Sequence, residues 1–183
     1  MLPIEAILFE PVGCLAEFPP GFNLNAPDIV QVQAVEEASI YEDVIPALVE
    51  LKAMGVKRVI TSALSAAAIH RLIERLAPAD FDGVWHRDNS GGIPLLRALE
   101  GASLAPDRTI FLTDTAEGLK AAQSASVHGI LMMNDPDESR RLASHNPSGG
   151  IVSLRELPDF IRLLRIRSDP SIAPAFPPTG SLH

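Results

Sequence analysis

The stretch AILFEPVGCL, residues 6–15, decides the fold of this chain. Its apolar run over residues 6–9 is typical of a strand that is buried on both faces. The run ends at Glu10, after which Pro11 and Gly13 predict a turn. Open α/β sheets bind their ligands just outside the carboxyl ends of the strands. The stretch therefore predicts a central strand of a parallel sheet, with the Glu10 carboxylate at its ligand-binding edge.

The composition describes a globular protein with one main domain. Hydrophobic residues make up 46% of the 183 residues, enough for a full core, and the apolar runs are too short to span a membrane. A formal net charge of −8 argues against general nucleic-acid binding, which needs clustered Lys and Arg. The single cysteine, Cys14, excludes an internal disulfide, and the N-terminus lacks the pattern of a secretory signal. We therefore expect a cytoplasmic protein.

Short apolar runs alternate with segments of helical periodicity, the pattern of a parallel sheet covered by helices. The predicted strands cover residues 5–9, 57–62, 83–86, 109–113 and 128–132, with an edge strand at 150–152. The predicted helices cover residues 42–54, 65–76, 93–100, 116–125, 137–143 and 155–165, and Ser65 is the expected N-cap of the second. We predict an α/β fold of the Rossmann-like, three-layer α/β/α type, with a mostly parallel central sheet, over residues 1–167.

Two segments lack this alternation. Residues 16–40 form an insertion after the first strand, with a Pro-Pro-Gly turn and one candidate helix over residues 29–38. Residues 168–183 are rich in proline and have little to bury, so we expect a mobile C-terminal tail. An interaction role for either segment is one hypothesis for function.

Four short stretches, in order, make residues 4–165 resemble the haloacid dehalogenase (HAD) superfamily. The first motif of that family, a strand followed by Asp-x-Asp-Gly-Thr-Leu, aligns with residues 10–15. The second, a strand ending in Thr or Ser, aligns with Thr61 and Ser62, and the fourth, Gly-Asp-x-x-x-Asp, aligns with residues 113–118. The resemblance covers nearly the whole chain and implies a HAD-like core with its chemistry at the carboxyl ends of the strands.

The positions that carry the family's chemistry differ in this chain. In the family, the first aspartate attacks phosphorus, the second protonates the leaving group, and Mg²⁺ is held by the nucleophile and the motif-four acids. Here Glu10 and Val12 take the two aspartate positions, and Gly118 takes that of the last acid. The family's third motif is a lysine before a helix, and near that place this chain has only Arg87. Because valine cannot transfer a proton, the first motif has lost a group typically worth roughly 10²–10⁴-fold in rate.

Each candidate residue has a structural reading beside the functional one. Glu10 is a degenerate nucleophile, a residual ligand of a metal or anion, or a solvated carboxylate at a strand end. Asp114 is either a Mg²⁺ ligand, together with Glu10 and with Glu117 as an outer helper, or the N-cap of the following helix. The residues expected to bind phosphate are Thr61, Ser62 and Arg87. The alternative for the two hydroxyl residues is that they only cap the next helix.

Two functions follow from these alternatives. The first is a HAD-like protein that is catalytically impaired and binds a divalent cation or a phosphate-like ligand, or acts through protein contacts. The second is an active Mg²⁺-dependent phosphatase or related hydrolase with a rebuilt site. The Mg²⁺ site is expected to be weak or absent in the first of these functions.

The insertion at residues 16–40 is too short for a separate cap domain. We therefore expect an open crevice, which a second copy of the chain or a macromolecular partner would cover. The expected partners are a small phosphorylated ligand, a protein or a second copy in a homo-oligomer, with no nucleic acid and no membrane.

Overall fold

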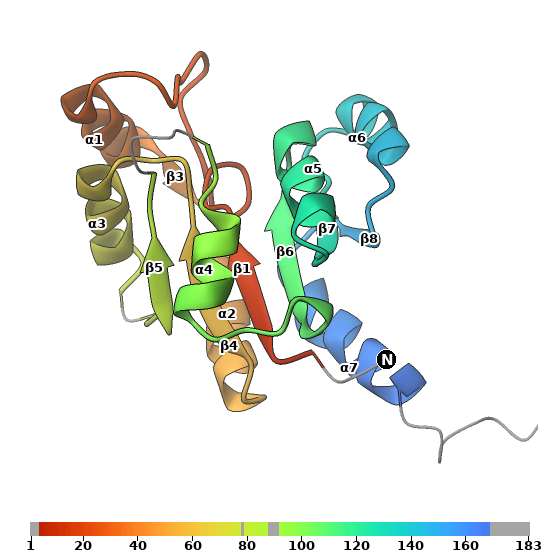
Figure 1. The fold of residues 1–183 in the computed structure, drawn as a ribbon. Coiled ribbons are helices and arrows are strands. Elements are labelled where there is room, and N and C mark those ends of the chain that lie inside the picture. The colour runs from red at the N-terminus through yellow and green to blue at the C-terminus, as the bar shows by residue number, and fades with distance from the viewer. Residues whose placement is uncertain (1–3, 78, 88–91, 169–183) are drawn as a thin grey trace, which may run out of the picture.

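The computed structural model describes residues 4–77, 79–87 and 92–168, which form a six-stranded sheet with helices on both faces (Figure 1). The strand order is β5-β4-β1-β6-β7-β8, and all neighbouring strands are parallel. Its strands are β1 (Ala6–Phe9), β4 (Lys57–Thr61), β5 (Gly83–Trp85), β6 (Thr109–Thr113), β7 (His128–Met132) and β8 (Gly149–Ile151). A separate antiparallel pair is formed by β2 (Ala16–Glu17) and β3 (Ser39–Ile40). The predicted three-layer, Rossmann-like α/β fold is confirmed.

The helices also follow the predicted segments, with ends that differ by a few residues. They are α1 (Asp28–Glu37), α2 (Val44–Ala53), α3 (Ala66–Arg75), α4 (Leu95–Gly101), α5 (Ala116–Ser124), α6 (Pro136–Leu142) and α7 (Glu156–Ser168). Ser65 is the N-cap of α3, as expected, and accepts a hydrogen bond from Ala68 N. The proline-rich tail lies outside the described residues after Ser168. No helix in the described ranges is both long enough and apolar enough to cross a membrane.

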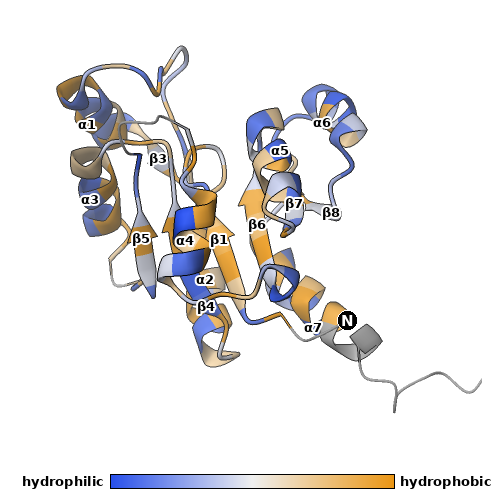
Figure 2. Cartoon of the chain, viewed as in Figure 1, coloured by the Kyte–Doolittle hydropathy of each residue, from blue (hydrophilic) through white to orange (hydrophobic). Residues whose placement is uncertain are grey.

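Strand β1 divides its side chains between two cores. Ile7 and Phe9 pack with residues of α2, α3 and α7, whereas Ala6 and Leu8 pack with residues of α4 and α5 on the other face. All four are fully buried. Figure 2 shows the same apolar character along β1 and β6 at the centre of the sheet. A strand covered on both faces needs apolar side chains at every position. The unbroken apolar run of residues 6–9 therefore predicts a central strand.

The 16–40 insertion folds against α3. Its helix α1, the candidate helix of the sequence, packs along α3. Glu36 forms an ion pair with Arg71, and the Arg75 guanidinium donates to Val35 O. These contacts place the loop before α1 next to the carboxyl ends of β1 and β4, where the candidate site lies.

Candidate functional site

Glu10 lies at the carboxyl end of β1, between the ends of β4 and β6. Its backbone N–H donates to Leu112 O at 3.0 Å, and only 4% of the residue is exposed. The Ser62 hydroxyl donates to Glu10 Oε1 at 2.8 Å, whereas Oε2 is buried with no hydrogen-bond partner among the described residues. The reading of Glu10 as a solvated carboxylate is therefore wrong, because its carboxyl group is turned into the protein.

This environment changes the protonation of Glu10. Burial, with a contribution from the negative charge of Asp114, raises the pKa of Glu10 from its ordinary 4.5 to about 8. The hydrogen bond from Ser62 and the backbone amides of Val12 and Ala63 lower the pKa and offset part of this rise. At pH 7 most molecules therefore carry a neutral Glu10. A neutral carboxylic acid is a poor nucleophile and a poor metal ligand.

Asp114 follows β6 and lies against the turn after β1. Asn134 Nδ2 donates to Asp114 Oδ2 at 3.4 Å and to Gly13 O at 2.7 Å, while Asp114 Oδ1 is buried and unpartnered in the described part of the chain. Burial raises the pKa of Asp114 from 3.8 to about 6, with a contribution from the charge of Glu138. A Cβ on Gly13, whose φ is +76°, would lie 1.8 Å from Asp114 Oδ2. Only glycine leaves room for the carboxylate there.

The fourth motif has changed at two coupled positions. Thr115, not Asp114, caps α5, because Thr115 Oγ1 accepts from Gly118 N at 3.0 Å. The reading of Asp114 as a helix cap is therefore wrong, and Asp114 does not line the cavity over Glu10 either. Thr113 takes the motif's glycine position, and a Cβ on Gly118 would lie 2.0 Å from Thr113 Oγ1. The threonine side chain thus fills the space of the missing second acid, a relation that the sequence analysis did not detect.

Thr61 and Ser62 follow one another at the end of β4 and are fully buried. The Ser62 hydroxyl, which donates to Glu10, also accepts from Leu64 N at 3.1 Å. Thr61 Oγ1 is buried and has no partner among the described residues. Neither residue lines the cavity over Glu10, where a phosphate was expected to bind. The Ser62 hydroxyl instead holds Glu10 in place.

A cavity of about 340 Å³ lies over Glu10. It brings four of the predicted site residues together, namely Glu10, Val12, Arg87 and Glu117. The rest of its lining is largely apolar and consists of Leu24, Asn25, Ala63, Gly92, Ile93, Thr115 and Ala121. The hydrocarbon side chain of Val12 therefore faces the space where the family's proton donor would act. We call this space the Glu10 cavity.

The chain itself supplies one wall of the Glu10 cavity, which differs from the open crevice expected from the sequence. Leu24 and Asn25 form this wall. Gln31, fully buried on α1, donates to Leu24 O at 3.0 Å and to Ala26 O at 2.8 Å, and its Oε1 accepts from Ser65 N at 2.9 Å. Arg87 Nη1 also donates to Leu24 O, at 2.5 Å.

Sequence reasoning missed the role of Gln31, although a signal for it exists. Gln31, Ala34 and Val35 are the buried residues of α1 and have the spacing of one helix face. A polar residue on a buried apolar face needs hydrogen-bond partners, because an unpaired buried amide is costly. A glutamine at this position therefore predicts that its side chain forms hydrogen bonds with a nearby segment of backbone.

Replacing Gln31 is expected to loosen the wall of the Glu10 cavity that Leu24 and Asn25 form. Gln31→Leu keeps the size of the side chain but leaves Ala26 O and Ser65 N without their partner, while Leu24 O keeps Arg87, and we expect a loss of about 2 kcal/mol in the free energy of unfolding. Urea denaturation followed by circular dichroism measures this loss. The matched control is Gln33→Leu on the same helix, because Gln33 is exposed and bonds only to Glu37, so we expect a change within about 0.5 kcal/mol. Equal losses in both variants would contradict the proposed role of Gln31.

Glu10 and Asp114 bring two carboxyl groups to this edge, and they match a metal site only once Glu10 has lost its proton. Glu10 Oε2 and Asp114 Oδ1 are buried oxygens without partners, and Mg²⁺ is often held by one or two carboxylates plus waters. Within the described ranges, no three His, Cys, Asp or Glu side chains come together as a metal-binding group, so Glu117 does not complete a set with the other two. Glu10 and Asp114 are the residues that would hold the ion.

Comparisons with known proteins agree with this arrangement. A family model described as haloacid dehalogenase-like hydrolase matches residues 25–132. Among curated protein sequences, none matches the chain.

Solved structures share the fold at low sequence identity. One is a predicted phosphatase from Clostridium acetobutylicum, with a TM-score of 0.74, 15% identity and coverage of 88% of this chain and 100% of that one. Another is the L-2-haloacid dehalogenase from Xanthobacter autotrophicus, with a TM-score of 0.66, 15% identity and coverage of 87% and 98%. A haloacid dehalogenase-like hydrolase from Streptococcus pneumoniae has a TM-score of 0.71, 17% identity and coverage of 86% and 98%. Because the family model spans more than half of the chain, the chain belongs to the haloacid dehalogenase-like hydrolase family.

Proposed function

We propose that this chain is a catalytically impaired HAD-like protein that keeps a weak site for a divalent cation or a phosphate-like ligand, or acts through protein contacts. The observation that carries the proposal is the buried Glu10 carboxyl group, held by Ser62, beside Val12 in the position of the proton donor. Because the pKa of Glu10 is raised to about 8, the residue at the nucleophile position is mainly neutral at pH 7.

No described residue takes over the role of the missing proton donor with suitable chemistry. His86, the nearest histidine, does not line the Glu10 cavity, and its Nδ1 lies 2.9 Å from Arg87 O. The Arg87 guanidinium stays charged at all ordinary pH values and cannot act as an acid. Glu117 does line the cavity, but it is exposed to solvent. The loss of acid–base assistance is therefore the main expected defect.

The second function is an active Mg²⁺-dependent phosphatase or related hydrolase. One observation favours it: Glu10 and Asp114 each have a buried oxygen without a partner among the described residues. In that case both residues would hold the ion and Arg87 would offset the charge of the phosphate, whereas Thr61, predicted to bind phosphate, is fully buried and does not line the cavity. A bound Mg²⁺ would supply positive charge for the phosphate oxygens. A guanidinium does not reproduce the point charge of the missing lysine, so this function needs a different binding geometry.

The expected partners remain a small phosphorylated ligand, another protein or a second copy of the chain. The net charge of −8 supports a ligand other than nucleic acid, and the buried thiol of Cys14 suits a reducing compartment such as the cytoplasm.

An activity assay separates the two functions. We expect the purified protein to show no Mg²⁺-dependent hydrolysis of p-nitrophenyl phosphate or of a panel of phosphorylated metabolites above the blank. The double variant Glu10→Asp/Val12→Asp is expected to hydrolyse p-nitrophenyl phosphate about 10²-fold faster than its matched control Glu10→Asp/Val12→Asn, because only the former carries a proton donor. Brisk hydrolysis by the unmodified protein, abolished by Glu10→Gln, would instead establish the active hydrolase.

A further inference from the structure

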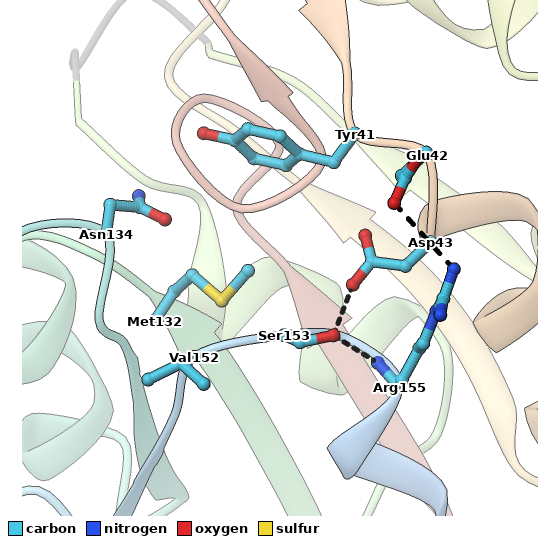
Figure 3. A pocket seen from close by; sticks show the side chains of 8 residues that line it. All are labelled: Tyr41, Glu42, Asp43, Met132, Asn134, Val152, Ser153 and Arg155. Atoms are coloured by element: carbon cyan, nitrogen blue, oxygen red, sulfur yellow. Dashed lines mark hydrogen bonds and ion pairs between the residues drawn. The ribbon is translucent and has the colours of Figure 1, made fainter.

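A second cavity, of about 320 Å³, lies at the carboxyl ends of β7 and β8 and shares no lining residue with the Glu10 cavity (Figure 3). Its apolar residues are Met132 and Val152, and Tyr41 lies over it. A volume of this size is at the lower end of the range for small-molecule sites, roughly 300–1,000 Å³. We call it the Tyr41 cavity.

Asp43 is a buried carboxylate at the wall of the Tyr41 cavity. Only 9% of the residue is exposed. Its Oδ2 accepts from Ser153 Oγ at 2.6 Å and from Leu154 N at 2.8 Å, so two donors fix the orientation of the carboxylate. Its Oδ1 has no hydrogen-bond partner among the described residues, and Figure 3 shows it on the Tyr41 side of the cavity. The single donor of the Ser153 hydroxyl is used by Asp43, and its Oγ also accepts from Arg155 N at 3.2 Å.

Two polar atoms left free at this cavity are hydrogen-bond acceptors, whereas the Tyr41 hydroxyl can donate as well as accept. Asn134 Nδ2 donates to Gly13 O and Asp114 Oδ2, which leaves Asn134 Oδ1 as an acceptor. With Asp43 Oδ1, the described lining therefore presents two acceptors that need a donor from outside, and the Tyr41 ring adds a π-face nearby. An ammonium group carries three N–H donors and suits the charged acceptor, Asp43 Oδ1.

The charges around Tyr41 favour a cation. Burial raises the pKa of Tyr41 to about 12, and the negative charges of Glu17, Asp114 and Asp43 contribute to the rise. Arg155 is the one cation among the lining residues, and its side chain is 67% exposed and lies 3.9 Å from Glu42. In Figure 3 its guanidinium lies at the rim, on the side of Glu42 away from Asn134.

We propose that the Tyr41 cavity binds a small primary amine, with the ammonium group on Asp43 Oδ1 and the apolar part on Met132 and Val152. The Tyr41 ring adds a cation–π contact. This site is separate from the Glu10 cavity and does not depend on whether hydrolase activity survives.

Ligand binding is tested by titrating the ¹⁵N-labelled protein with benzylamine, benzyl alcohol and benzoate. We expect benzylamine to shift the amide resonances of residues 41–43, 132–134 and 152–155. Because a charge-assisted hydrogen bond is lost in the other two probes, we expect these to bind at least about tenfold more weakly. The proposal fails if benzylamine causes no shifts at about 10 mM, a concentration that corresponds to very weak binding. It also fails if benzoate or benzyl alcohol binds equally well, or if the shifts centre on Val12 and Arg87.

Variants locate the ammonium group. Asp43→Asn is expected to weaken benzylamine binding at least about tenfold, whereas its matched control Glu42→Gln, which alters the neighbouring exposed carboxylate, is expected to change it less than about threefold. Arg155→Gln removes a competing cation and is expected to strengthen binding.

Tyr41→Leu is the second line of evidence if Asp43→Asn does not fold. This variant removes the ring and is expected to weaken binding about threefold or more. Unchanged affinity in the folded Asp43→Asn protein, or in Tyr41→Leu, would overturn the proposal.

Discussion

The free energy of unfolding is expected to fall by about 3 kcal/mol as the pH rises from 5 to 8, and Glu10→Gln is expected to remove most of this fall. Glu10 titrates near 4.5 in the unfolded chain and near 8 in the fold. Between these values the folded protein holds a proton that the unfolded chain releases, so stability is full below pH 4.5 and is lost as the pH rises toward 8. Asp114 adds a smaller fall between pH 3.8 and about 6.

Urea denaturation at several pH values between 5 and 8, with EDTA present, measures this dependence. The matched control is Glu117→Gln, which alters an exposed carboxylate of the same cavity and is expected to follow the unmodified protein. At pH 8 the Glu10→Gln protein is expected to be the most stable of the three, because a neutral amide avoids the cost of a buried charge. A profile of the unmodified protein that does not fall with pH would show that water or a bound cation reaches Glu10.

Gly118→Ala is expected to destabilise the protein by about 3 kcal/mol, at the upper end of ordinary overpacking. The new Cβ would lie 2.0 Å from Thr113 Oγ1 and 2.6 Å from Thr113 Cβ. The Thr113 Cβ is fixed by strand β6, so a change of rotamer does not remove the clash. Only Thr113→Gly clears the space, and in that background Gly118→Ala is expected to be neutral or slightly stabilising, because alanine favours a helix more than glycine.

Denaturation of the two single variants, the double variant and the unmodified protein forms a double-mutant cycle. We expect a coupling of about 2 kcal/mol or more between positions 113 and 118. Gly150→Ala is the control, since its Cβ would meet only the flexible side chain of Met133, at 3.0 Å. Additive losses would contradict the coupling. If the coupling holds, restoring the missing acid of motif four requires both Thr113→Gly and Gly118→Asp.

Much of the fold was predictable from local patterns. Three elements could be predicted from residues close together in the chain, and the structure confirms all three. They are the strand at residues 6–9, the helix after Ser65 and the strand before Asp114. The sequence also shows that Val12 and Gly118 replace acids of the family motifs, because each motif specifies residue types at fixed positions. The helical reading of residues 29–38 is confirmed as α1, but nothing local in that stretch indicates that it packs on α3.

Residue types and their spacing were enough to predict the order of the motifs along the chain, the place of Glu10 at a strand end and a valine where the family has its proton donor. The state of Glu10 depended on the assembled protein, since its partner Ser62 lies 52 positions away and its pKa is raised mainly by burial. The same holds for the hydrogen bond from Ser65 N to Gln31 Oε1, 34 positions apart, and for Asp43, whose partners lie more than a hundred positions away. Desolvation and long-range hydrogen bonds arise only when distant segments pack together, and no local pattern in the chain records them.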